Sequence, residues 1–212
     1  MKIGILIKSI GLAGVGWGFP WPTGADIAVF RRPVKTDGGV KYVMCIPATS
    51  FKGALRSAAS RVARAYNFSS CGGICRSDLC DVCRLFGAPG MKAPSKLRVS
   101  DFYSDNAESF ILTRIRINDS SYRVEKGGLF TEEYLLPGAI FTGEINLPDD
   151  LDQNLIKLLL IGLAELRLGR LGRGFPFDLK ICEPKSLEKI IDDAKWIGLL
   201  EDLGRWLWDE VI

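Results

Sequence analysis

The sequence of 212 residues contains no histidine, and this absence excludes several kinds of catalytic site. A Ser-His-Asp triad, a Cys-His pair and a histidine that serves as general acid or base all require an imidazole. Catalysis by this chain would therefore have to use a carboxylate, a Lys, Tyr, Ser or Cys side chain, or a metal ion held by carboxylates.

The sequence also lacks a long hydrophobic run and a strong excess of charge of one sign. The longest apolar stretch, residues 155–168, is interrupted by charged residues and is shorter than the roughly 20 residues that a membrane span needs. The apolar stretch at residues 1–8 is too short and too interrupted by charged residues for a signal peptide. We therefore expect a cytoplasmic protein with no membrane partner. Because the formal net charge is only +3, a nucleic-acid surface would depend on local clusters of basic residues.

The composition is that of an ordinary globular protein, with 47% hydrophobic and 25% charged residues. The length is sufficient for one core, and no internal repeat or low-complexity linker divides it. We therefore expect a single domain over residues 1–212 with two insertions, a cysteine-rich knuckle at residues 69–86 and a charged, alternating hairpin at residues 109–134.

Without these insertions, the predicted elements follow the order β-α-β-β-α-β. This order is that of the α+β, ferredoxin-like fold, a four-stranded antiparallel sheet with two helices on one face, which RNA-recognition modules share. Further extended segments are predicted at residues 27–31 and 40–46. The elements that give the order are predicted at residues 2–9, 50–66, 97–102, 140–147, 151–168 and 175–182.

The helix predicted at residues 50–66 carries the first candidate site. The preceding strand stops at Pro47, which cannot donate to a sheet ladder. Thr49 or Ser50 can then cap the helix, and Lys52 and Arg56 lie four residues apart on one helix face. The first turn thus offers backbone N–H groups, a hydroxyl and two cations, which suit a phosphate. An amphipathic helix with a solvated basic face is the alternative interpretation.

Four cysteines are clustered with the spacing C-x3-C-x4-C-x2-C, at Cys71, Cys75, Cys80 and Cys83. Four thiolates in one short loop suit a tetrahedral Zn²⁺ site. Without histidine this site would be all-sulfur and closed, so we expect a structural zinc ion. Two disulfides and an iron–sulfur cluster are the competing interpretations.

A glycine-rich segment, residues 169–174, follows the second predicted helix. Gly169, Gly172 and Gly174 let a backbone approach a polyanion closely, and Arg170 and Arg173 supply positive charge. The alternative is a helix-terminating turn with two solvated arginines.

The excursion at residues 109–134 alternates between apolar and basic positions. Arg114 and Arg116 lie on the same face of its first strand, and a turn signal follows at residues 118–121. An ordinary hairpin with one solvated basic face fits the same pattern.

Several of these segments resemble the RAMP superfamily of CRISPR-associated proteins. Residues 47–56 resemble its Pro-x-(Ser/Thr)-Ser-(Leu/Phe)-Lys-Gly-x-Leu-Arg signature, and the excursion resembles its thumb-like hairpin. The glycine-rich segment resembles the C-terminal loop of the family but departs from it at Arg170 and Pro176. The chain looks most like the backbone subunits of type III effector complexes, some of which carry a zinc-bound insertion.

The resemblance implies a subunit that holds guide RNA, with sequence specificity left to base pairing. It implies as partners the guide crRNA, the target RNA, other CRISPR effector subunits and further copies of the chain along the RNA. The residues that it implies for RNA contact are Ser50, Lys52, Arg56, Arg114, Arg116, Gly169, Arg170, Gly172, Arg173 and Gly174.

The segment 24–31 resembles the family segment that carries an aspartate before an apolar strand, and Asp26 matches that aspartate. In target-cleaving subunits the aspartate is catalytic, so the resemblance implies cleavage of guide-paired RNA by Asp26. An exposed aspartate is ionised at neutral pH and suits holding a hydrated Mg²⁺ or orienting a ribose 2′-OH, so we expect Mg²⁺ as the ion for cleavage. The acidic residue often found after the strand is here Arg32, a departure from the pattern. Three alternatives stay open: a non-catalytic structural subunit in which Asp26 forms a turn, a guide-RNA processing endoribonuclease of related fold, and an unrelated zinc-stabilised RNA-recognition module.

Overall fold

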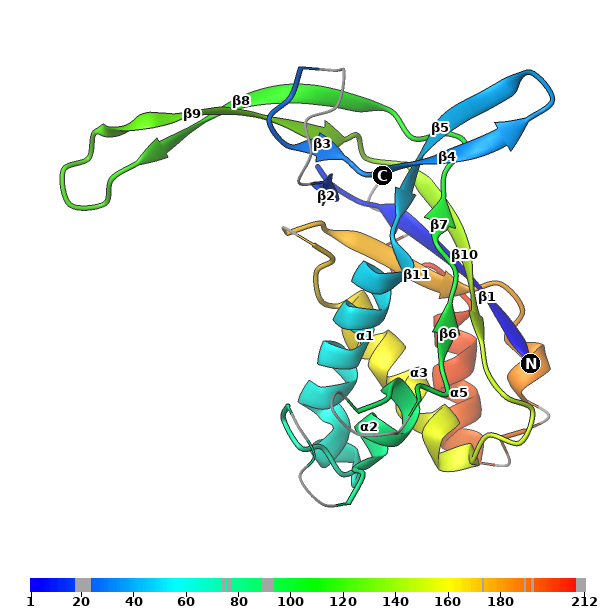
Figure 1. The fold of residues 1–212 in the computed structure, drawn as a ribbon. Coiled ribbons are helices and arrows are strands. Elements are labelled where there is room, and N and C mark those ends of the chain that lie inside the picture. The colour runs from blue at the N-terminus through cyan, green and yellow to red at the C-terminus, as the bar shows by residue number, and fades with distance from the viewer. Residues whose placement is uncertain are drawn as a thin grey trace.

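The computed structural model describes residues 1–17, 24–73, 75, 78–88, 94–172, 174–188, 190–191 and 193–208. Its helices lie together on one side of the main sheet, and two hairpins project from the far end of the molecule (Figure 1). In chain order the elements are β1 (Lys2–Ser9), β2 (Gly16–Trp17), β3 (Ala28–Val29), β4 (Arg31–Thr36), β5 (Gly39–Ile46), α1 (Ala48–Val62), the 3₁₀ helix η1 (Ala63–Tyr66), α2 (Asp81–Phe86), β6 (Arg98–Val99), β7 (Phe102–Tyr103), β8 (Ser109–Ile117), β9 (Val124–Leu135), β10 (Ile140–Asn146), α3 (Gln153–Arg167), β11 (Phe177–Ile181), α4 (Lys185–Glu188) and α5 (Ala194–Leu203).

The main sheet is antiparallel and has the strand order β11-β1-β10-β7-β5-β4, with β6 also paired to β10. In β1 every second side chain is buried, at Ile3, Ile5 and Ile7, which is the two-residue period of a strand covered on one face. The mixed α/β architecture with an antiparallel sheet, predicted from the sequence, is confirmed.

Close approaches at two glycines join the layers. A Cβ at Gly162 of α3 would lie 3.0 Å from the Cβ of Ala59, so glycine lets α3 pack tightly on α1. A Cβ at Gly143 of β10 would lie 2.5 Å from the Phe102 ring, which packs on Phe51 of α1 with ring centroids 4.6 Å apart. None of the helices in the described part of the chain has the length and apolarity needed to span a bilayer.

Part of the opposite sheet face is covered by the chain's own C-terminal segment. Trp206 lies beside two lysines of adjacent strands, with its ring centroid 5.8 Å from Lys8 Nζ and 4.7 Å from Lys180 Nζ. The Asp178 carboxylate accepts a hydrogen bond from the backbone N–H of Leu207 at 2.7 Å, which fixes this segment to β11. The face that RNA-recognition modules use for nucleotides is therefore not fully open here.

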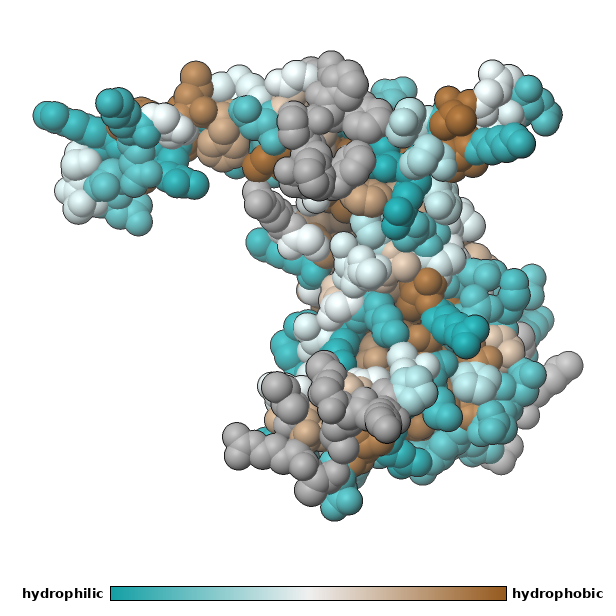
Figure 2. Space-filling model, viewed as in Figure 1, coloured by the Kyte–Doolittle hydropathy of each residue, from teal (hydrophilic) through white to brown (hydrophobic). Residues whose placement is uncertain are grey.

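The hairpin β8–β9 covers the predicted excursion and pairs Ile115 with Leu129. It projects away from the sheet and carries brown apolar and teal polar side chains side by side (Figure 2). Its exposed apolar residues include Ile111, Ile115, Ile117, Tyr122, Val124 and Leu129.

The structure corrects the predicted start of α1. The helix begins at Ala48 rather than at Ser50, and its N-cap is Pro47, so the expectation that Thr49 or Ser50 caps it is wrong. The cap comes from a distant carboxylate instead, because Asp101 accepts a hydrogen bond from the Ala48 N–H at 2.7 Å. An acidic group thus already occupies one of the backbone donors that we expected to be free for a phosphate.

The strands flanking α1 also differ from the prediction. The extended segment predicted at residues 27–31 contains the short strand β3, but the sequence analysis missed that β4 continues to Thr36 and pairs with β5 as a hairpin. Pro33 is tolerated in this hairpin because β4 is an edge strand. The single strand predicted at residues 97–102 is split into β6 and β7, since the Ser100 hydroxyl, rather than a strand carbonyl, accepts the Glu144 N–H at 2.9 Å.

Candidate functional site

A groove lies between α1 and the glycine-rich segment, with a cavity of about 750 Å³. It brings together three of the residues singled out in the sequence: Ser50 of α1, and Arg170 and Gly172 of the glycine-rich segment. Gly172 has φ +57°, which favours glycine, and a Cβ there would lie 3.2 Å from the Gly14 carbonyl oxygen. The lining residues are Thr49, Ser50, Gly53, Ala54, Ser57, Arg61, Leu166, Arg170 and Gly172.

The positive charge of the groove comes from two arginines. Arg170 is exposed and has no ion-pair partner among the described residues. Arg61 bonds Glu165 through Nε at 2.9 Å, yet its side chain remains 54% exposed. The sequence analysis missed Arg61 and Gly53, although Ser50, Gly53, Ser57 and Arg61 recur at the three- and four-residue spacing of one helix face. Arg173 lies outside the described residues.

Gly53 is exposed in the groove, and the fold of the chain does not explain why it is a glycine. A Cβ at this position would meet no atom within 4 Å, and φ of this residue is not positive. Glycine inside a helix costs about 1 kcal/mol relative to alanine. The groove therefore keeps an open strip of helix surface at some loss of stability.

Lys52 and Arg56 both donate to protein acceptors on the other flank of α1. Lys52 Nζ donates to Ser95 Oγ at 2.7 Å and to the Leu97 carbonyl at 3.1 Å, and burial, followed by the charge of Arg56, lowers the pKa of Lys52. Arg56 donates to the Gly87 carbonyl at 2.9 Å. The structure thus places the two predicted phosphate-binding cations against the segment after α2, away from Ser50 and Arg170.

The four clustered cysteines lie close enough together to hold a metal ion, since their Sγ atoms all lie within 4.8 Å of one another. Cys71 and Cys83, and likewise Cys75 and Cys80, have Sγ atoms 3.6 Å apart. Zn–S bonds of about 2.3 Å in a tetrahedron place sulfurs about 3.8 Å apart, so the donor set fits zinc. A disulfide would require about 2.05 Å, and all four thiols are free, which excludes the two-disulfide interpretation for this structure.

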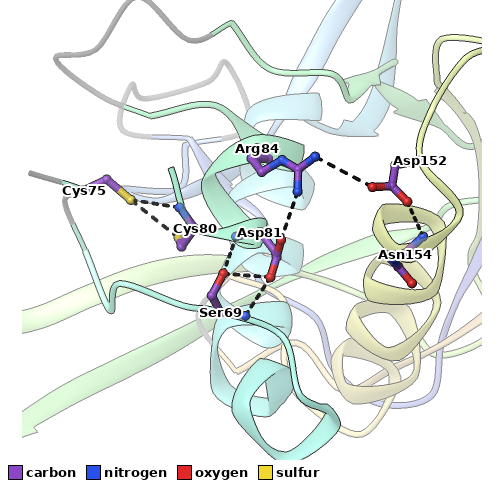
Figure 3. A network of polar contacts seen from close by, with 7 residues as sticks. All are labelled: Ser69, Cys75, Cys80, Asp81, Arg84, Asp152 and Asn154. Atoms are coloured by element: carbon purple, nitrogen blue, oxygen red, sulfur yellow. Dashed lines mark hydrogen bonds and ion pairs between the residues drawn. The ribbon is translucent and has the colours of Figure 1, made fainter. Parts of the chain in front are cut away.

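The cysteine knuckle is fastened to the helices by a chain of polar contacts (Figure 3). Asp81 Oδ2 accepts from both the N–H and the hydroxyl of Ser69, at 2.8 and 2.7 Å. Arg84 pairs with Asp81 at 3.3 Å and with Asp152 at 3.7 Å, and Asp152 caps α3 by accepting from the Asn154 N–H. The knuckle, α2 and the start of α3 therefore form one connected unit.

Asp26 lies at the root of the β8–β9 hairpin. Its Oδ2 accepts from the Thr131 N–H at 2.7 Å and the Thr131 hydroxyl at 2.9 Å, and the Asp26 N–H donates to that hydroxyl at 3.0 Å. The backbone bond, followed by the hydroxyl, lowers the pKa of the exposed Asp26 carboxyl. These contacts tie the N-terminal segment to β9 rather than closing a local turn.

Among the described residues, Asp26 does not belong to any group of three or more side chains that could hold a metal ion. Across the described ranges, the cysteine cluster is the one group of three or more His, Cys, Asp or Glu side chains with suitable spacing. In the described part of the chain, a Mg²⁺ ion at Asp26 would therefore not have a ready-made set of three carboxylate ligands.

The hairpin arginines take part in cross-strand contacts. Arg114 Nε lies 3.8 Å from Glu132 Oε2, and its guanidinium lies 4.9 Å from the Tyr134 ring centroid. Arg116 lies 3.7 Å from Glu125, with its side chain largely exposed. These pairs leave both guanidinium groups partly accessible along the hairpin.

A comparison with protein families finds a match over residues 30–207 to the model described as the RAMP superfamily. The matched range includes α1, the cysteine knuckle, the β8–β9 hairpin and the glycine-rich segment, whereas Asp26 lies before it. No curated protein shows a significant match. Because the match covers most of the sequence, the chain belongs to the RAMP superfamily, whose members generally bind RNA and act in CRISPR complexes.

Proposed function

We propose that this chain is a backbone subunit of a type III CRISPR effector complex and that it holds guide RNA in the groove between α1 and the glycine-rich segment. The groove supports this proposal because one surface is lined by exposed hydroxyls, an open glycine and Arg170, which has no ion-pair partner in the described part of the chain. Such a surface binds phosphates without reading bases, which suits a protein whose specificity comes from base pairing.

We further assign the chain to the ferredoxin-like fold and treat it as one domain with two insertions. The strand order β11-β1-β10-β7, with α1 before β6 and β7 and α3 between β10 and β11, supports that assignment. In this scheme the hairpin β8–β9 and the cysteine knuckle are additions to the core. The exposed apolar and basic side chains of the hairpin suit contacts with RNA and with neighbouring subunits.

The exposed Gly53 is the main support for RNA binding in the groove. A polyanion that approaches the helix backbone closely would explain a glycine that packing and φ do not require. A longer side chain at this position would block that approach without disturbing the free protein.

Replacing Gly53 by Gln should therefore weaken RNA binding at least tenfold while raising the free energy of unfolding by about 0.5 kcal/mol, because Gln is the better helix former. Affinity would be measured by filter binding of guide-length RNA and stability by urea unfolding. Gly198→Gln is the matched control, since Gly198 lies in α5 and a Cβ there also meets no atom within 4 Å. That control should gain stability and keep its RNA affinity.

Arg170→Ala should weaken binding to RNA of any sequence and reduce the salt dependence of the affinity by roughly one phosphate contact. If Gly53→Gln and Arg170→Ala both keep wild-type affinity and salt dependence, the groove does not hold RNA. Unchanged binding by Gly53→Gln alone would confine the contact to the glycine-rich segment.

We also propose a structural zinc ion at Cys71, Cys75, Cys80 and Cys83. Since all four positions of the tetrahedron would be filled by protein, the ion would hold the knuckle together and would not activate water. A hydrogen bond from the Gly73 N–H is the leading cause that lowers the pKa of the Cys71 thiol to about 7, which supports ligation by a thiolate at neutral pH.

A second proposed activity is cleavage of guide-paired RNA at Asp26. It is favoured by one observation: both bonds to the carboxylate end on Oδ2, so within the described residues Oδ1 has no partner and can hold a hydrated Mg²⁺ or orient a ribose 2′-OH. The competing proposal is that Asp26 only docks the hairpin through Thr131.

Asp26→Asn separates these two roles, because the amide oxygen can still accept from Thr131 while the charge is lost. In an assembled complex, guide binding should persist and target cleavage with Mg²⁺ should fall at least a hundredfold at the positions this subunit lines. Asp37→Asn, at an exposed turn of the β4–β5 hairpin, should cleave normally. Full cleavage by Asp26→Asn would support the structural role.

A further inference from the structure

We infer that Arg56 belongs to the metal centre, where its guanidinium binds a zinc-ligating sulfur from the second coordination sphere and couples the knuckle to α1. This inference rests on the proposed zinc site. It gives the last residue of the α1 signature a role different from the RNA contact that the sequence implied.

The contacts of Arg56 carry this inference. Its Nη2 donates to Cys83 Sγ at 3.4 Å, while Nη1 donates to the Gly87 carbonyl at 2.9 Å. Cys83 is fully buried in α2, and Gly87 directly follows that helix. One planar group thus holds both a ligand sulfur and the end of the helix that presents it.

The charge of the centre explains why a cation belongs at this place. Four thiolates around one Zn²⁺ leave two negative charges in excess. A buried anion is stable only when it is paired and hydrogen-bonded, and Arg is always protonated. A charge-assisted N–H···S bond from Arg56 to Cys83 meets both requirements.

Lys52 provides an internal comparison on the same helix. It lies one turn before Arg56 and is also partly buried, but it donates to Ser95 Oγ and the Leu97 carbonyl and to no cysteine sulfur. If the positive charge on α1 in general stabilised the metal, replacing either residue would lower the zinc affinity. If the hydrogen bond to sulfur stabilises it, only the replacement of Arg56 should lower the zinc affinity.

The test is the zinc affinity of the full chain, measured by competition with a chromophoric chelator. Arg56→Gln should bind zinc 10–100-fold more weakly than the wild type, the usual effect of losing a second-sphere partner. Lys52→Gln should keep the wild-type affinity. Arg56→Lys keeps the charge but loses the two-pronged geometry, so its zinc affinity should fall between those of the wild type and Arg56→Gln.

Co²⁺ substitution adds a readout that a merely structural role of Arg56 would leave unchanged. Loss of a hydrogen bond to a ligand sulfur should shift the thiolate-to-Co²⁺ charge-transfer band of Arg56→Gln, whereas Lys52→Gln should give the wild-type spectrum. An Arg56→Gln protein with wild-type zinc affinity and spectrum would overturn the inference, as would an equal loss of affinity in both variants. A wild-type protein that takes up no zinc would instead overturn the metal centre itself, leaving the RNA groove to its own tests.

Discussion

Replacing Asp178 by Ala should lower the free energy of unfolding by about 3–5 kcal/mol, since it would leave Arg167 charged and unpaired in the interior. The Arg167 Nε and Asp178 Oδ1 atoms lie 2.6 Å apart, and the two side chains are 6% and 1% exposed. Asp178 also accepts from the N–H groups of Leu207 and Trp208 at 2.7 and 3.0 Å, so the same change frees the C-terminal segment.

Urea unfolding at neutral pH measures this effect. Asp178→Asn should lose less stability than Asp178→Ala, because the amide oxygen can still accept one hydrogen bond. The matched control is Glu144→Ala, which breaks an ion pair with Lys2 at the surface, where the Lys2 side chain is 73% and the Glu144 side chain 39% exposed. This change should lower the free energy of unfolding by less than about 1 kcal/mol. Equal losses for Asp178→Ala and Glu144→Ala would contradict the prediction.

Glu133→Ala should detach the root of the β8–β9 hairpin, with a local loss of about 3–5 kcal/mol, because it breaks the buried ion pair with Arg31 and removes the acceptor of the Ser109 hydroxyl and the Val29 N–H. Glu133 Oε1 accepts from Arg31 Nη2 at 2.5 Å and from the Ser109 hydroxyl at 2.6 Å. Its Oε2 accepts from Arg31 Nη1 at 2.8 Å and from the Val29 N–H at 2.9 Å. One carboxylate thus joins β3, β4, β8 and β9. Hydrogen exchange of the β8 and β9 amides would report the detachment, and the β1 and β10 amides should remain protected.

The same carboxylate makes the hairpin sensitive to acid. Burial acts to raise the pKa of Glu133, but the hydrogen bonds from Arg31, Ser109 and Val29 outweigh it and lower the pKa below the ordinary value of 4.5. A lowered folded pKa gives stability that is present above pH 4.5 and is lost as the pH falls through the folded value. Protection of the hairpin amides should therefore be constant near neutrality and decline below pH 4.5. Glu133→Gln should remove this decline, and an unchanged acid response in that variant would argue against the assignment.

The sequence predicted the parts of the fold that depend on local pattern. The two-residue period of β1, the apolar face of α1 and the spacing of the cysteines each record an environment that neighbouring residues share. The strands and helices that build the mixed sheet architecture follow from such patterns. The cysteine cluster could also be predicted, because all its ligands lie within a short segment.

The partners of the charged residues could not be predicted in the same way. Helix spacing placed Lys52 and Arg56 on one face of α1, but it carried no information on what covers that face. Their acceptors, at Gly87 and in the segment of Ser95 and Leu97, lie tens of residues away along the chain. The cap of α1 by Asp101 and the bonds between Asp26 and Thr131 are equally distant in sequence, so periodicity could not reveal them.

The two flanks of α1 have one more consequence. Gly53 and Ser57 face the groove, while Arg56, on the same helix, holds a cysteine sulfur of the knuckle. If RNA and zinc both depend on the position of this helix, their binding energies are thermodynamically linked, and the linkage must be reciprocal. The factor by which zinc raises the affinity for RNA equals the factor by which RNA raises the affinity for zinc. If zinc strengthens RNA binding, a subunit that carries RNA would retain its zinc against a chelator that removes zinc from the free chain.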